Sequence, residues 1–76
     1  MVTAYVMIKA STGDVDRLKT EMSSADDTVE RVSVVAGDID YIVKLWVDGP
    51  SDVKDVATSI RGMAGIENTQ TYIAMD

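Results

Sequence analysis

The sequence predicts an α+β domain with elements in the order strand, helix, strand, strand, helix, strand. Four stretches are rich in alternating apolar or β-branched residues, and two stretches between them carry apolar residues at helical spacing. The length of 76 residues, without a low-complexity run, allows a single domain over residues 1–76. This order of elements is that of the ferredoxin-like βαββαβ arrangement, in which two helices cover one face of a four-stranded antiparallel sheet.

The first strand and the first helix come from the opening third of the chain. Side chains of Val2–Ala10 alternate between an apolar face and a mixed face. This pattern is typical of a strand covered on both sides. Ser11–Asp14 interrupts the pattern and supplies oxygens that can cap a helix. The apolar residues Val15, Leu18 and Met22 then follow at helical spacing and predict the helix itself.

The middle of the chain predicts a hairpin. Thr28–Ala36 is rich in valine, and Tyr41–Val47 is rich in β-branched and aromatic residues, so both favour strands. The connection Gly37–Asp40 is short, and we therefore expect the two strands to pair in antiparallel fashion.

The closing third predicts a second helix and a fourth strand. Ser51 or Asp52 follows a turn and is placed to cap a helix. An apolar stripe then runs at helical spacing until Gly62 and Gly65 close the helix. Glu67–Met75 alternates again and predicts the last strand of the sheet.

The composition excludes several kinds of site. Cysteine and histidine are both absent, which removes disulfides, thiolate or imidazole metal ligands and the commonest general base. Neither a metalloprotease motif nor a glycine-rich phosphate loop is present. The sequence therefore predicts no catalytic residue, no metal and no cofactor. A small enzyme on this scaffold stays an alternative, because a fold alone does not decide function.

The net charge of −6 argues against anionic partners. The chain has seven basic and thirteen acidic residues, and the basic residues form no cluster. We therefore expect no direct nucleic-acid binding and no membrane association. No run of about 18 apolar residues and no basic leader stands in the chain, which predicts a cytoplasmic protein. Ten of the acids are aspartate and lysine is scarce, a composition that suggests a high-salt cytoplasm.

A candidate binding site combines the hairpin loop with the last strand. We expect Gly37–Asp40 to face the hydroxyls of Thr69 and Thr71 in an otherwise apolar setting. A carboxylate can hold an α-ammonium group, and backbone N–H groups at a turn can hold a carboxylate, so such a site could recognise a free amino acid. The alternative is that Asp38 and Asp40 form a polar turn and that the threonines favour a strand.

One face of the predicted sheet lacks a cover. Two helices can cover only one face, whereas Tyr, Met, Trp or Val residues from several strands lie on the other. The aromatic residues could stack on nucleic-acid bases, but no basic cluster accompanies them. We therefore expect a second copy of the chain to cover this face.

Three segments, in order, resemble the effector-binding domain of the leucine-responsive (Lrp/AsnC) regulators. Gly37–Val43 resembles the G-x-[YF]-D hairpin segment of that family, Gly62–Ile73 its closing segment and Ala4–Ile8 its first strand. Ile39 stands where the family usually has an aromatic residue. The helix-turn-helix domain of full-length members is missing from this chain, so the resemblance is to the stand-alone form of the domain.

The resemblance implies an αβ-sandwich that dimerises through its sheets and assembles into larger, often octameric rings. It also implies that a free amino acid or similar small effector binds between dimers, near the hairpin loop and the last strand. Carried over by position, the ligand-binding residues are Gly37, Asp38, Ile39, Asp40, Thr69, Thr71, Tyr72, Ile73 and Ala74. Asp40 matches the loop aspartate of the family and is the first choice for ligand contact. Full-length regulators are the implied protein partners, and a purely structural subunit that acts without ligand is the alternative.

Overall fold

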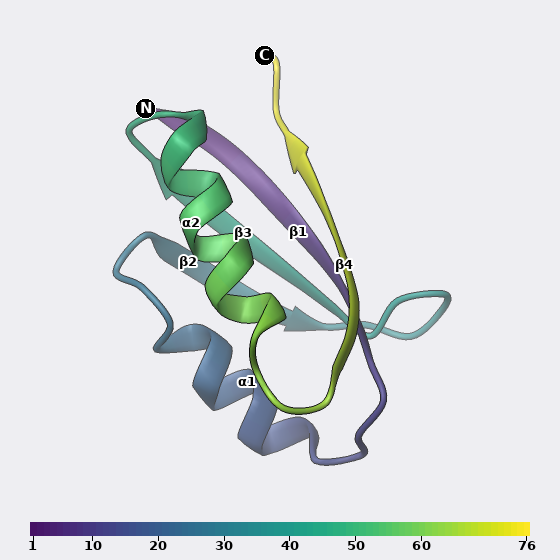
Figure 1. The fold of residues 1–76 in the computed structure, drawn as a ribbon. Helices are drawn as coiled ribbons and strands as arrows, with labels where there is room; N and C mark the ends of the chain where they lie inside the picture. Colours follow the sequence, from purple (N-terminus) through teal and green to yellow (C-terminus); the bar gives the residue numbers. More distant parts are fainter.

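The computed structural model describes residues 1–76 and confirms the predicted order of elements. The elements are β1 (Val2–Ala10), α1 (Val15–Ser23), β2 (Val29–Val34), β3 (Tyr41–Val47), α2 (Pro50–Arg61) and β4 (Ile66–Ile73). All neighbouring strands pair antiparallel in the order β2-β3-β1-β4, and both helices lie on one face of the sheet (Figure 1). This is the ferredoxin-like fold that the sequence predicts.

The core fills the space between the helices and the sheet. Alternate residues of β1 and β3 point into it, and the register places Val6 opposite Val43. Burying a side chain of this size stabilises the fold by about 1.5–3 kcal/mol. The thirteen buried residues are Ala4, Val6, Ile8, Leu18, Met22, Val32, Tyr41, Val43, Leu45, Val47, Val53, Val56 and Ile60. All are hydrophobic, and they form a single cluster.

The other face of the sheet has no helix over it, and we call it the open face. Its side chains come from the alternate positions of the same strands, because successive residues of a strand point to opposite faces. The open face includes Thr3, Tyr5, Met7, Lys9, Ile42, Lys44, Trp46, Asn68, Gln70 and Tyr72. Trp46 and Tyr72 are each 53% exposed, so this face presents large aromatic surface to solvent in the single chain.

The bounds of two predicted strands need correction. β2 runs from Val29 to Val34 rather than from Thr28 to Ala36, and Val35 and Ala36 belong to the loop. β4 runs from Ile66 to Ile73 rather than from Glu67 to Met75. The antiparallel hairpin between β2 and β3 is confirmed, with Val34 opposite Tyr41.

The predicted N-cap of α2 was wrong, whereas its predicted end at Gly62 is confirmed. Gly49, not Ser51 or Asp52, is the N-cap of α2, because Pro50 occupies the first helical position, where its fixed φ fits and no N–H is needed. At α1 the N-cap Asp14 makes no side-chain capping bond. The Asp14 carboxylate instead contacts the Arg17 guanidinium, with Oδ2 and Nε 3.3 Å apart. Neither helix is long and apolar enough to cross a membrane.

Candidate ligand-binding site

The C-terminal end of the loop between β2 and β3 is hydrogen-bonded to β1. The Asp40 N–H donates to the Ile8 carbonyl at 2.8 Å, and the Val35 N–H donates to the Asp40 carbonyl at 2.9 Å. Gly37 has a φ of +141°, a conformation that side chains rarely adopt. The loop projects beyond the sheet at the end where β3 begins (Figure 1).

Asp40, the expected first ligand contact, has a structural bond of its own. Its Oδ2 accepts the Ala10 N–H at 2.9 Å, at the point where a bulge shifts the pairing of β1 with β4. The next residue, Tyr41, is 1% exposed, and burial raises the pKa of its phenol, with the charge of Asp40 adding to the shift. Through its bond to the Ala10 N–H, the Asp40 carboxylate holds the loop against the end of β1.

We expect Asp40→Ala to lower the free energy of unfolding by about 1.5–3 kcal/mol, because a part-buried N–H loses a bond to a charged acceptor. Asp40→Asn should lose less, since its amide oxygen can still accept the bond. Asp38→Ala is the matched control, because the Asp38 carboxylate is exposed and makes no hydrogen bond. Urea unfolding followed by circular dichroism measures all three, and equal effects of Asp40→Ala and Asp38→Ala would contradict the assignment.

A hollow of about 210 Å³ lies beside the loop on the open face. Asp38 and Ile39 of the loop line it together with Met7 and Lys9 of β1. The amide side chains of Asn68 and Gln70 on β4 complete it. Lys9 and Asp38 both line the hollow, and the Lys9 ammonium donates to the main-chain carbonyl of Asp38 at 3.5 Å.

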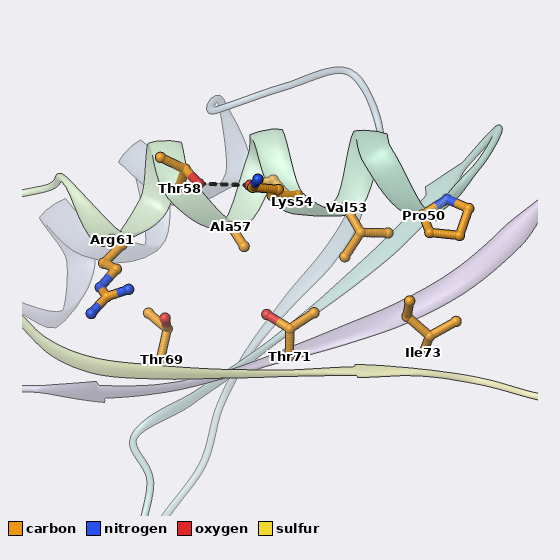
Figure 2. Close-up of a pocket in the computed structure, with 9 residues that line it drawn as sticks. All are labelled: Pro50, Val53, Lys54, Ala57, Thr58, Arg61, Thr69, Thr71 and Ile73. Atoms are coloured by element: carbon orange, nitrogen blue, oxygen red, sulfur yellow. Dashed lines mark hydrogen bonds between the residues drawn. The ribbon is translucent and has the colours of Figure 1, made fainter.

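The threonines of β4 lie on the opposite face of the sheet from this hollow. Thr69 and Thr71 pair with the buried β1 residues Ile8 and Val6, so their side chains point toward the helices. With Ile73 they form one wall of a groove of about 490 Å³ between β4 and α2 (Figure 2). The α2 wall consists of Pro50, Val53, Lys54, Ala57, Thr58 and Arg61.

The expectation that the loop faces Thr69 and Thr71 is therefore wrong within one chain. Residues 69, 71 and 73 have the opposite orientation from residues 68, 70 and 72, because side chains alternate along a strand. Tyr72 lies on the open face, where it pairs with Tyr5. Beyond β4, the Ala74 N–H donates to the Thr3 carbonyl at 2.9 Å. The role of the nine residues in ligand binding stays a prediction.

Sequence reasoning missed four residues of the hollow and two cations of the groove. Lys9 comes to the hollow because it pairs with Asn68, and Met7 because it pairs with Gln70. These partners stand about sixty positions apart, and no local pattern indicates their register. The polar side chains at alternate positions of the last strand were the available signal. No group of three or more acidic side chains is placed to hold a metal ion.

The fold defines a small ferredoxin-like domain, and its family follows from comparison with known proteins. The family model of the Lrp/AsnC ligand binding domain matches residues 3–76. The chain therefore belongs to the Lrp/AsnC ligand-binding domain family, as the resemblance implied.

Several solved structures have the same fold. TTHA0845 from Thermus thermophilus has a TM-score of 0.91 and 27% identity, covering 100% of this chain and 95% of that chain. FFRP-DM1 has a TM-score of 0.87 and 33% identity, covering 99% of this chain and 100% of that chain. The feast or famine regulatory protein Rv3291c from M. tuberculosis, complexed with L-methionine, has a TM-score of 0.76 and 24% identity. That match covers 100% of this chain and 51% of the other, so this chain spans about half of that regulator. No curated protein matches the chain.

Proposed function

We propose that this protein is a stand-alone effector-binding and assembly domain that binds a free amino acid at the hollow beside the hairpin loop. The observation that carries the proposal is the pair of opposite charges at that hollow, Lys9 and Asp38. The Lys9 ammonium would hold the α-carboxylate, and the Asp38 carboxylate would hold the α-ammonium group. Met7 and Ile39 supply apolar surface for the ligand side chain.

A second copy of the chain is part of the proposal. The loop residues Gly37–Asp40 and Tyr72 lie apart from Thr69, Thr71 and Ile73 within one chain, so a site that uses all nine predicted residues needs two copies. The exposed aromatic residues of the open face favour a dimer formed through the sheets. We propose that such dimers form larger rings in the cytoplasm and co-assemble with full-length regulators of the family.

Isothermal titration of the purified protein with each of the common amino acids tests the proposal. Asp38→Asn and Lys9→Gln should each weaken the tightest binder by about tenfold or more, because each removes a charge-assisted hydrogen bond of about 1.5–3 kcal/mol. Lys19→Gln and Asp27→Asn are the controls, because both residues are exposed and line neither the hollow nor the groove. Both controls should bind like the wild type.

Failure of every amino acid to bind at millimolar concentration would overturn the amino-acid proposal. The exposed aromatic open face would then favour the second candidate, a structural subunit that modulates a partner protein without ligand. That candidate predicts stable oligomers in the absence of any effector and capture of a helix-turn-helix homologue in a pull-down.

A further inference from the structure

The hollow beside the loop contains every side-chain carboxamide of the protein. Asn68 is the only asparagine in the sequence and Gln70 the only glutamine, and both line the hollow from β4. They stand two residues apart on one strand, so their side chains point to the same face of the sheet. Together with Lys9 and Asp38, they give four of the six lining residues a polar end. Recognition of the α-ammonium and α-carboxylate groups by Lys9 and Asp38 leaves both carboxamides without a role.

Most of the hydrogen-bonding capacity of the two carboxamides is unused in the single chain. The Tyr72 hydroxyl donates to Gln70 Oε1 at 3.1 Å, which leaves the NH2 group of Gln70 free to donate. The Asn68 carboxamide makes no hydrogen bond, so its NH2 group and its oxygen are both free. The hollow therefore offers donors and an acceptor side by side, and a ligand group that both accepts and donates satisfies them best.

We infer that the effector bound in this hollow is an amino acid whose side chain ends in a carboxamide, glutamine or asparagine. The inference rests on the proposed function, because it needs Lys9 and Asp38 to hold the α-groups. The amide oxygen of the ligand side chain would accept from the NH2 group of Gln70. Its own NH2 group would donate to the Asn68 oxygen.

The same lining disfavours other kinds of side chain. An aliphatic or thioether end would cover the two carboxamides of β4 without offering them a partner. A carboxylate end can accept but not donate, and it would stand near Asp38 in a chain of net charge −6. A basic end would meet the Lys9 ammonium. The methylene groups of a carboxamide side chain, in contrast, find apolar surface on Met7 and Ile39.

Isothermal titration with two matched sets of amino acids tests this selectivity. Glutamine, glutamate and methionine have side chains of similar length and differ in the group at the end, and asparagine and leucine share one branched shape. We expect glutamine to bind about tenfold or more tightly than methionine and glutamate, and asparagine to exceed leucine in the same way, because two hydrogen bonds are gained.

Gln70→Met should weaken glutamine binding by about threefold to tenfold and should not weaken methionine binding, so the selectivity between the two ligands falls. Asn68→Leu should act in the same direction. Both residues are exposed, so neither change removes a core side chain. Glu67→Met is the matched control, because Glu67 is an exposed residue of the same strand that does not line the hollow. It should keep the wild-type selectivity.

Two kinds of failure are distinguishable. Asp38→Asn should weaken glutamine and methionine alike, since it acts on the α-ammonium group that both ligands share. Binding of methionine as tight as that of glutamine, or equal selectivity of Gln70→Met and Glu67→Met, would overturn the carboxamide inference and leave the amino-acid function in place. Failure of every amino acid to bind would overturn both.

Discussion

Gly65→Ala is expected to lower the free energy of unfolding by about 3 kcal/mol. Gly65 has a φ of +92°, and strain of this kind costs about 1–3 kcal/mol for other residues. A Cβ at this position would also lie 2.5 Å from Thr12 Cγ2, and overpacking adds about 1–3 kcal/mol. The Gly65 carbonyl accepts the Ser11 N–H at 2.8 Å, so a shift of the turn would break a hydrogen bond at the C-terminal end of β1. Such a loss is a large share of the stability of a small domain.

Gly62→Ala is the matched control for this substitution. Gly62 has a φ of −77°, and a Cβ there would meet only the Ser59 and Thr58 carbonyls at ordinary distances of 3.6 and 3.8 Å. Its effect should be within about 1 kcal/mol of zero and can be stabilising. Adding Thr12→Ser to Gly65→Ala removes the clashing Cγ2 and should restore part of the stability. Urea unfolding at one protein concentration measures these changes, and similar values for Gly65→Ala and Gly62→Ala would refute the prediction.

Trp46→Glu is expected to weaken dimerisation by about a hundredfold or more. In the proposed dimer the indole is covered by the partner sheet, and a buried charge without a partner costs about 3–5 kcal/mol. Val34→Glu is the control, since Val34 is 50% exposed, close to the 53% of Trp46, but pairs with Tyr41 and so points to the helix side.

Sedimentation velocity over a range of concentrations distinguishes the two variants. The wild type and Val34→Glu should sediment as oligomers, whereas Trp46→Glu should sediment as a monomer at low concentration. A wild type that is monomeric throughout the range would remove the dimer from the proposal. Equal weakening by both variants would show that the open face is not the interface.

Local sequence patterns predicted the elements and most of the core. Alternation predicted β1, because a strand with one face toward a core needs an apolar residue at every second position. Composition rich in β-branched residues, together with a short connection, predicted the β2–β3 hairpin. The helical spacing of Leu18 and Met22 likewise matched the buried stripe of α1. The start of α2 was misplaced, because the preference of Pro50 for the first helical position outweighed the capping preference of Ser51 and Asp52.

The candidate site was predicted only in part. Family resemblance predicted a site formed by the loop and β4, and the structure places Asp38 and Ile39 of the loop at the hollow. The bond between Asp40 and the Ala10 N–H joins residues thirty positions apart, and no pattern at either position indicates it. Arg61 was not singled out, because a basic residue at a helix end is common in any surface helix.

The sequence by itself determined the fold class, the absence of cysteine and histidine chemistry, and the family, because each depends on residue type and local spacing. Only the tertiary structure decided which residues share a face of the sheet. The alternation of residues 66–73 is visible in the sequence, but the pairing with β1 determines which set meets the helices. That pairing puts Thr69 and Thr71 beside Arg61, and Gln70 beside Asp38, on opposite faces of the sheet. The long-range register of β1 with β4 therefore separates the groove from the hollow, and the two differ in the charges that line them.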